Sequence, residues 1–167
     1  MSVVAVKVNK NGFEMCADSQ ATDGQLPIER SKLYEYDGLI IGTSGYTEDM
    51  SLMQLFIRTS KPVDPTEFSI LDFMSSFYDW IYKKTHKWSE EYNHWLIGMN
   101  GKVFCVTGWD VVEINDMYAI GCGDEIALTA MHLGHSAYDA VKIACKLNVY
   151  CGEPIIKFVQ TIKKKGK

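Results

Sequence analysis

The 167-residue sequence predicts an α+β fold of four layers, an αββα sandwich with two stacked sheets between two helical layers. Three observations predict it. Short β-branched runs are joined by Asn-Gly and Asp-Gly pairs, which favour the tight turns of antiparallel hairpins. Two further regions repeat apolar residues at helical spacing, and each region divides into a pair of helices. The chain order of strands, two helices, strands, two helices and a last strand gives one helical layer on each side of the sheets.

The strands are predicted from runs of β-branched and aromatic residues that end at turn-forming pairs. Asn11-Gly12, Asp37-Gly38 and Asn100-Gly101 each supply the positive φ angles that a two-residue hairpin turn needs. Asp23-Gly24 and Pro27 are interpreted as a turn. We expect strands over residues 3–8, 13–18, 31–36, 39–43, 92–99, 102–107, 111–115, 117–121 and 155–162.

The helices are predicted from apolar stripes and from residues that favour helix ends. Thr47 and Asp124 are candidate N-caps of the first and third helices, and Ser136 is the candidate N-cap of the fourth. Gly134 is expected to end the third helix in a left-handed conformation. In the second helix, over residues 69–84, apolar and aromatic side chains share one face, which predicts packing against the core rather than a cofactor site.

The composition fits one domain over residues 1–167 and argues against several classes of function. The net charge is −4 and the basic tail, residues 163–167, is short, so we expect no nucleic-acid partner. The chain has neither a long apolar span nor the pattern of a secretory signal, so we expect no membrane segment and a cytoplasmic location. An odd number of cysteines without CxxC spacing argues against a disulfide framework or a zinc site: Cys16, Cys105, Cys122, Cys145 and Cys151.

Three segments occur in a characteristic order. Val-Val-Ala-Val-Lys at residues 3–7 precedes Cys-Ala-Asp-Ser-Gln-Ala-Thr at 16–22. Ser-Lys-Leu at 31–33 then leads to Ile-Ile-Gly-Thr-Ser-Gly at 40–45, and Tyr-Ala-Ile-Gly-Cys-Gly at 118–123 precedes a pair of helices. In this combination the sequence resembles the proteasome β-subunit family of N-terminal-nucleophile hydrolases, which includes the bacterial ATP-dependent protease HslV. The resemblance implies the same αββα fold.

The resemblance also implies a catalytic group around Ser2. In such hydrolases the side chain of the first residue is the nucleophile, and its free α-amine, with a pKa of roughly 8, acts as the base through a water. Ser2 becomes the first residue once Met1 is removed. Lys32 matches the cation of the family and Asp18 the carboxylate that holds it, while the backbone N–H of Gly45 matches the donor to the oxyanion.

Further positions match groups that support the amine or bind the substrate. Cys122, Asn148 and Cys151 fall where the family has a serine, an aspartate and a second serine. A thiol is a weaker hydrogen-bonding group than a hydroxyl, and Asn148 carries no charge. A peptide substrate is implied to bind as an added strand along Gln20, Ala21, Thr22 and Gly45.

Two alignments of the first residues stay open. Matching the strand Val-Ala-Val-Lys places Met1 at the position of the nucleophile, whereas counting back from Asp18 places Ser2 there. The small second residue favours removal of Met1. If Met1 stays attached, Ser2 has no free amine and this mechanism is blocked.

The resemblance implies a cytoplasmic peptidase subunit that cleaves peptides or unfolded proteins inside a hexameric or heptameric ring. Such a ring could stack as a double ring and work with an ATP-dependent unfoldase. Two alternatives stay open, a non-catalytic homologue with a structural or assembly role and an amidase for small amides. Neither a metal nor another cofactor is expected, because no ligand pattern joins the histidines, His86, His94, His132 and His135.

Overall fold

The computed structural model describes residues 2–23, 26–87 and 93–162. Its elements follow the predicted order of strands, helix pairs and strands. They are β1 (Val4–Asn9), β2 (Gly12–Ala17), β3 (Gln20–Asp23), β4 (Leu26–Glu29), β5 (Leu33–Tyr36), β6 (Leu39–Ser44), α1 (Thr47–Phe56), α2 (Glu67–Thr85), β7 (His94–Met99), β8 (Lys102–Thr107), β9 (Asp110–Ile114), β10 (Met117–Ile120), α3 (Asp124–His132), α4 (Ala137–Leu147) and β11 (Ile156–Thr161).

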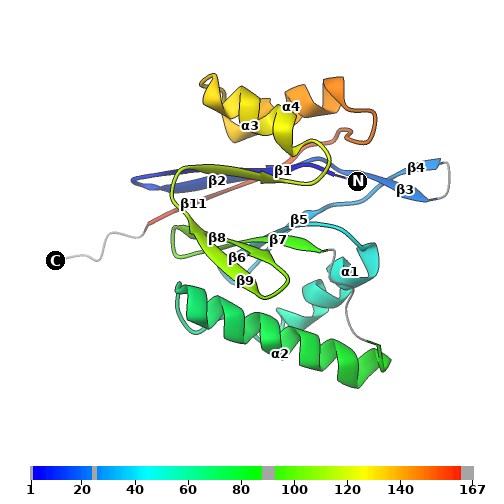
Figure 1. The fold of residues 1–167 in the computed structure, drawn as a ribbon, viewed down its shortest axis with the longest axis vertical. Helices are drawn as coiled ribbons and strands as arrows, with labels where there is room; N and C mark the ends of the chain where they lie inside the picture. Colours follow the sequence, from blue (N-terminus) through cyan, green and yellow to red (C-terminus); the bar gives the residue numbers. More distant parts are fainter. Residues whose placement is uncertain (1, 24–25, 88–92, 163–167) are drawn as a thin grey trace.

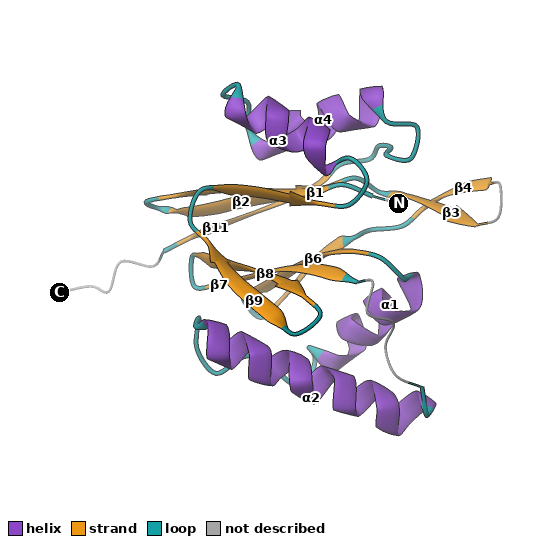
Figure 2. Ribbon diagram, in the orientation of Figure 1, coloured by secondary structure: helices purple, strands orange, loops and turns teal. Residues whose placement is uncertain are grey.

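These elements form the four predicted layers (Figures 1 and 2). Helices α3 and α4 lie over an antiparallel sheet with the strand order β10-β1-β2-β11. The second antiparallel sheet, β5-β6-β7-β8-β9, packs beneath it, and α1 and α2 cover its outer face. The α+β fold class and the αββα architecture predicted from the sequence are therefore confirmed.

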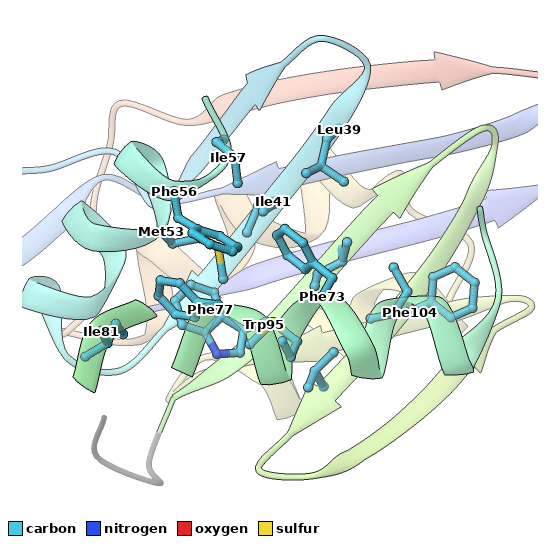
Figure 3. Close-up of a cluster of buried hydrophobic side chains, with 14 residues drawn as sticks. Leu39, Ile41, Met53, Phe56, Ile57, Phe73, Phe77, Ile81, Trp95 and Phe104 are labelled. Atoms are coloured by element: carbon cyan, nitrogen blue, oxygen red, sulfur yellow. The ribbon is translucent and has the colours of Figure 1, made fainter. Parts of the chain in front are cut away.

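Apolar side chains fill the spaces between the layers. Val4 of β1 and Leu96 of β7 belong to the buried cluster between the two sheets. Figure 3 shows the cluster between the second sheet and its helices, in which the ring of Phe77 from α2 meets Trp95 edge-on at a centroid distance of 5.8 Å. The apolar face predicted for residues 69–84 thus packs against the core, because burying these rings removes a large apolar area from water.

Two of the three predicted hairpin turns follow the local chemistry of the sequence. The turn predicted at Asn11-Gly12 is wrong, because Asn9 pairs with Gly12, so the turn residues are Lys10 and Asn11 and Gly12 already begins β2. Asp37 and Gly38 have φ angles of 48° and 78°, and Asn100 and Gly101 have 51° and 81°. These are the left-handed conformations expected of Asp-Gly and Asn-Gly turns. Gly134, after α3, has a φ of 99°, so its predicted left-handed conformation is also confirmed.

The predicted helix caps are partly wrong. Ser136 caps α4 as expected, because its Oγ accepts a hydrogen bond from the Asp139 N–H at 3.0 Å. Thr47, however, is the first residue of α1, and Tyr46 precedes it as the N-cap with an extended ψ of 129°. Asp124 is likewise the first residue of α3 rather than its cap. An N-cap is the residue whose backbone is not yet helical. Tyr46 takes this position because the chain leaving β6 is still extended there, although its side chain makes no capping hydrogen bond.

Residues 20–23 and 26–29 form a pair of strands that the sequence did not predict. Strand β3 pairs with β4, with Ala21 opposite Ile28 and Thr22 opposite Pro27. The turn expected at Pro27 is wrong, because this residue lies within β4. In an antiparallel pair the N–H groups of alternate residues point away from the partner strand, so a proline is tolerated at such a position on an edge strand.

Some expectations concern residues outside the described part of the chain. These are Met1, the Gly24 end of the Asp23-Gly24 turn, residue 92 at the start of a predicted strand and the basic tail over residues 163–167. Within residues 2–23, 26–87 and 93–162, no helix is long and apolar enough to cross a membrane.

Candidate active site

Asp18 and Lys32 form a buried ion pair where β2 ends and β5 begins. The Nζ of Lys32 lies 2.7 Å from Asp18 Oδ1, and the two side chains are 3% and 0% exposed. The ammonium also donates to the backbone carbonyl oxygen of Gln20. A charge inside a protein is tolerated only when it is paired and hydrogen-bonded, and this pair satisfies both conditions.

The Asp18 carboxylate also binds three backbone N–H groups from separate segments. Val3 donates to Oδ1 at 2.9 Å, and Gln20 and Gly152 each donate to Oδ2 at 3.1 Å. The carboxylate therefore ties together the entry to β1, the start of β3 and the loop before β11. With the bond from Lys32, both carboxylate oxygens are fully hydrogen-bonded, as a buried carboxylate requires.

Ser2 lies next to this group, just before β1. The Val3 carbonyl accepts a hydrogen bond from the Asp18 N–H at 3.1 Å, and Ser2 is the next residue outward. The hairpin between β1 and β2 pairs Asn9 with Gly12 and therefore has a two-residue turn. The Ser2 side chain donates from Oγ to Ser44 Oγ at 3.4 Å, and the residue is 1% exposed.

The bend between β10 and α3 holds the backbone of Ser2. The Ser2 N–H donates to Cys122 Sγ at 3.2 Å, and the Cys122 thiol is placed to donate to the Ser2 carbonyl at 3.4 Å. The Gly123 N–H donates to the same carbonyl at 3.2 Å. Gly121 has a φ of 101°, and a Cβ at that position would lie 2.3 Å from the Ser2 carbonyl oxygen, so this close approach requires glycine.

Asn148 and Cys151 act on this bend through Cys122. The Nδ2 of Asn148 donates to the Cys122 carbonyl at 2.7 Å, and the Sγ atoms of Cys122 and Cys151 lie 3.9 Å apart. Burial raises the pKa of the Cys151 thiol, and the Asp18 carboxylate raises it further, so this thiol stays neutral. Asn148 therefore orients the bend through a neutral amide rather than by charge.

Ser2, Lys32 and Gly45 line one cavity of about 220 Å³. Gly45 follows β6 and has a φ of +142°, which a residue with a side chain rarely adopts. The cavity joins a hydroxyl, an ammonium and the backbone of Gly45, which are the groups that an acyl-transfer site needs. The remaining lining residues come from β3 and from the segment that begins α1: Ala21, Thr22, Tyr46, Thr47 and Met50.

The three residues of β3 predicted to bind a substrate strand differ in what their backbones can offer. The Gln20 N–H already donates to Asp18, and its carbonyl already accepts from Lys32. The Arg30 N–H donates to the Ser19 carbonyl at 2.7 Å, and the alternation of an antiparallel ladder then directs Ala21 toward β4. By the same alternation, Thr22 presents its N–H and carbonyl on the side of β3 that faces away from β4.

The structure brings together every residue that the sequence singled out, and it adds several that the sequence did not. The Gly152 N–H binds Asp18, Ser44 binds the Ser2 hydroxyl, and Asn93 packs against Gly45. Ser44 belongs to the Ile-Ile-Gly-Thr-Ser-Gly motif at residues 40–45, so the sequence carries a signal for its position. Gly152 acts through its backbone, and Asn93 lies far along the chain, just before β7, so no local pattern marks either of them.

The fold is shared with solved structures of proteasome-type proteins. Thiobacillus denitrificans BPH, solved in complex with epoxomicin, matches with a TM-score of 0.86 at 16% identity, over 97% of this chain and 100% of that chain. Anbu from Yersinia bercovieri matches with a TM-score of 0.74 at 12% identity, over 98% of this chain and 88% of that chain. HslV from Trypanosoma brucei matches with a TM-score of 0.65 at 19% identity, over 94% of this chain and 98% of that chain.

Sequence comparison gives no corresponding match. No protein-family model matches the chain, and no curated protein matches its sequence. At identities below a fifth, structural likeness is a statement about the fold, since one scaffold hosts many functions. The chain therefore shares the αββα fold of these proteasome-type structures.

Proposed function

We propose that this chain is a subunit of a self-compartmentalised peptidase that hydrolyses peptide bonds with Ser2 as its N-terminal nucleophile. The observation that carries the proposal is the shared cavity of Ser2, Lys32 and Gly45, whose ammonium is fixed by the buried Asp18. A buried ion pair beside a hydroxyl has a chemical use, because the cation stabilises negative charge on the oxygen as its proton leaves.

The chemistry begins once Met1 is removed. The free α-amine of Ser2 accepts the Oγ proton through a water, and Oγ attacks the carbonyl carbon of the scissile peptide bond. The negative charge moves to the carbonyl oxygen, where the Gly45 N–H stabilises it. The amine then returns the proton to the leaving nitrogen, the C–N bond breaks, and an ester to Ser2 remains until water hydrolyses it and restores the free hydroxyl.

The supporting residues keep the amine in place during these steps. Cys122 contacts both the nitrogen and the carbonyl of Ser2, and Asn148 and Cys151 hold Cys122. The substrate would add as a strand beside Thr22, with its reacting carbonyl at Gly45 and a side chain near Ala21. Gln20 then serves the ion pair rather than the substrate, because its backbone groups are already bonded.

Assembly into a hexameric or heptameric ring, single or double, is the second half of the proposal. Enclosure would restrict this cytoplasmic peptidase to unfolded chains delivered by an ATP-dependent unfoldase. The proteasome-type fold supports this, and native mass spectrometry of the purified protein measures the ring directly.

Hydrolysis of fluorogenic peptides tests the proposal, with an N-terminus verified by intact mass. Ser2→Ala and Lys32→Ala should each lower turnover by at least about 100-fold, the scale for loss of a catalytic group. Lys102→Ala, which removes an exposed lysine from a surface ion pair on β8, is the matched control and should keep full turnover. Equal turnover by all four proteins would rule out the proposed mechanism.

A non-catalytic homologue with an assembly role is the alternative, and one observation favours it. Ser2 is 1% exposed and its hydroxyl is bonded to Ser44, which is an unusual state for a nucleophile. The mass of the protein purified from its native host separates the two. Retention of Met1 there favours the assembly role, and its loss favours the peptidase.

A further inference from the structure

Asn93 lies directly behind the segment that carries the proposed oxyanion donor. The residue immediately precedes β7 and is 2% exposed. A Cβ built on Gly45 would lie 1.9 Å from Asn93 Oδ1 and 2.9 Å from Asn93 Cα, so the Asn93 side chain occupies the space beside the Gly45 backbone. Asn93 is not among the residues that line the cavity, and it contacts two that are, Gly45 and Tyr46.

The Asn93 amide bridges two points at the start of α1. Its Oδ1 accepts a hydrogen bond from the Tyr46 N–H at 2.6 Å, and its Nδ2 donates to the Asp49 carboxylate. Tyr46 is the N-cap of α1 and makes no capping bond through its own side chain, while Asp49 is in the first turn and 7% exposed. One side chain therefore joins the residue after Gly45 to the beginning of the helix.

This bridge resembles a capping box in which a third side chain, that of Asn93, stands between the two usual partners. In a capping box, a side chain three residues into the helix reaches back to the N-cap N–H. Here Asp49 stands three residues after Tyr46, and the Asn93 amide carries the connection between them. The Asn93 amide can take only this orientation. The Tyr46 N–H can only donate, so it needs the amide oxygen, and the amide nitrogen is then left to donate to the Asp49 carboxylate.

We propose that Asn93 is a positioning residue that fixes the direction of the Gly45 N–H in the catalytic cavity. Ser44 pairs with His94 at one side of Gly45, and Tyr46 is bonded to Asn93 at the other, so both neighbours of Gly45 are tied to the start of β7. An oxyanion donor is effective only when it is held in place before the charge develops. The inference rests on the proposed peptidase function.

An exchange of two residues tests it. In Asn93→Asp, two carboxylates face each other, which should turn the introduced carboxylate away from Tyr46 and release the Gly45 segment. Turnover number should fall about 10- to 100-fold with KM changed less than about twofold, because the donor acts on the transition state. The double variant Asn93→Asp with Asp49→Asn restores a donor opposite an acceptor, and it should regain most of the lost turnover.

Two further measurements separate positioning from general instability. Thr66→Ala removes the side-chain cap of α2, away from the cavity, and should lower the melting temperature while leaving turnover unchanged. Hydrogen exchange at the Tyr46 amide should accelerate in Asn93→Asp and slow again in the double variant.

The outcomes distinguish this inference from the function on which it rests. A wild-type protein without turnover rejects the peptidase, and unchanged Tyr46 exchange in Asn93→Asp then rejects the bridge as well. An active wild type with an equally active Asn93→Asp rejects the positioning role alone. The positioning role is also rejected if the double variant regains the melting temperature of the wild type but its turnover number stays as low as that of Asn93→Asp.

Discussion

The Nζ of Lys32 lies 2.7 Å from Oδ1 of Asp18, and the Val3 N–H donates to the same oxygen at 2.9 Å. One carboxylate oxygen thus binds the proposed catalytic cation and the residue that follows the proposed nucleophile. The ion pair has a structural role as well as a chemical one, because it sets where the chain enters β1.

Asp18→Asn should destabilise the fold more than Lys32→Met does. Asp18 accepts from Val3 and Lys32 on one oxygen and from Gln20 and Gly152 on the other. In Asp18→Asn the new amide NH₂ group would therefore face hydrogen-bond donors in either orientation of the side chain. The free energy of unfolding should fall by about 3–5 kcal/mol, as for a broken buried pair. In Lys32→Met the carboxylate keeps its three backbone donors, so a smaller loss is expected in urea titrations. A larger loss for Lys32→Met would contradict this account.

Activity should depend on the state of the N-terminus. A fusion protein cleaved to leave Ser2 first should hydrolyse peptides, whereas the chain that begins with Met1 should not, because its Ser2 nitrogen is an amide and cannot accept a proton. Intact mass identifies each form, and circular dichroism should show the same fold for both. Equal activity of the two forms would exclude the amine as the base.

The exposed backbone of Thr22 should contribute to substrate affinity. Thr22→Pro removes one N–H from the side of β3 proposed to pair with substrate, and proline should raise KM about tenfold, the scale of one lost hydrogen bond. Thr22→Ala keeps this N–H and is the matched control, with KM within about twofold of wild type. Peptide hydrolysis measures both, and an unchanged KM in Thr22→Pro would place the substrate elsewhere.

Cys122 should react with iodoacetamide before the other cysteines. Cys122 is exposed, whereas Cys16, Cys105 and Cys151 are buried and Cys145 is half-buried. The raised pKa values of these four thiols suppress the reactive thiolate. At pH 8 we expect one fast adduct by intact mass, mapped to Cys122 by peptide analysis and lost in Cys122→Ala. Because Cys122 contacts Ser2, this adduct should also block peptide hydrolysis.

The fold should weaken at alkaline pH. Burial, followed by the Glu14 carboxylate, raises the pKa of the Cys16 thiol above its ordinary value of 9.0, and burial raises that of Cys145 to about 11. The unfolded chain then releases these protons near pH 9 while the folded chain keeps them, so the free energy of unfolding falls as pH rises above about 9. Each group contributes up to about 1.4 kcal/mol per pH unit. Cys16→Ala should reduce this slope between pH 9 and 11 in denaturant titrations, and an unchanged slope would contradict the assignment.

The sequence by itself determined the layers of the molecule and much of the candidate site. Asn-Gly and Asp-Gly turns, apolar periodicity and the Ser136 cap act over a few residues, and so they fix the hairpins and helices locally. The pairing of Asp18 with Lys32 was implied by the resemblance of their motifs to the proteasome β-subunit family, and the structure places the two side chains 2.7 Å apart.

The tertiary structure alone decided which backbone groups meet. No local pattern marks the pairing of β3 with β4, the bond from the Gly152 N–H to Asp18 or the bond between Asn93 and Tyr46. A backbone N–H has no signature in the residue type that carries it. The same holds for the cap of α1, which follows from the path of the chain out of β6. Side-chain patterns are local, whereas hydrogen bonds between distant backbone groups depend on the register and packing of the whole sandwich.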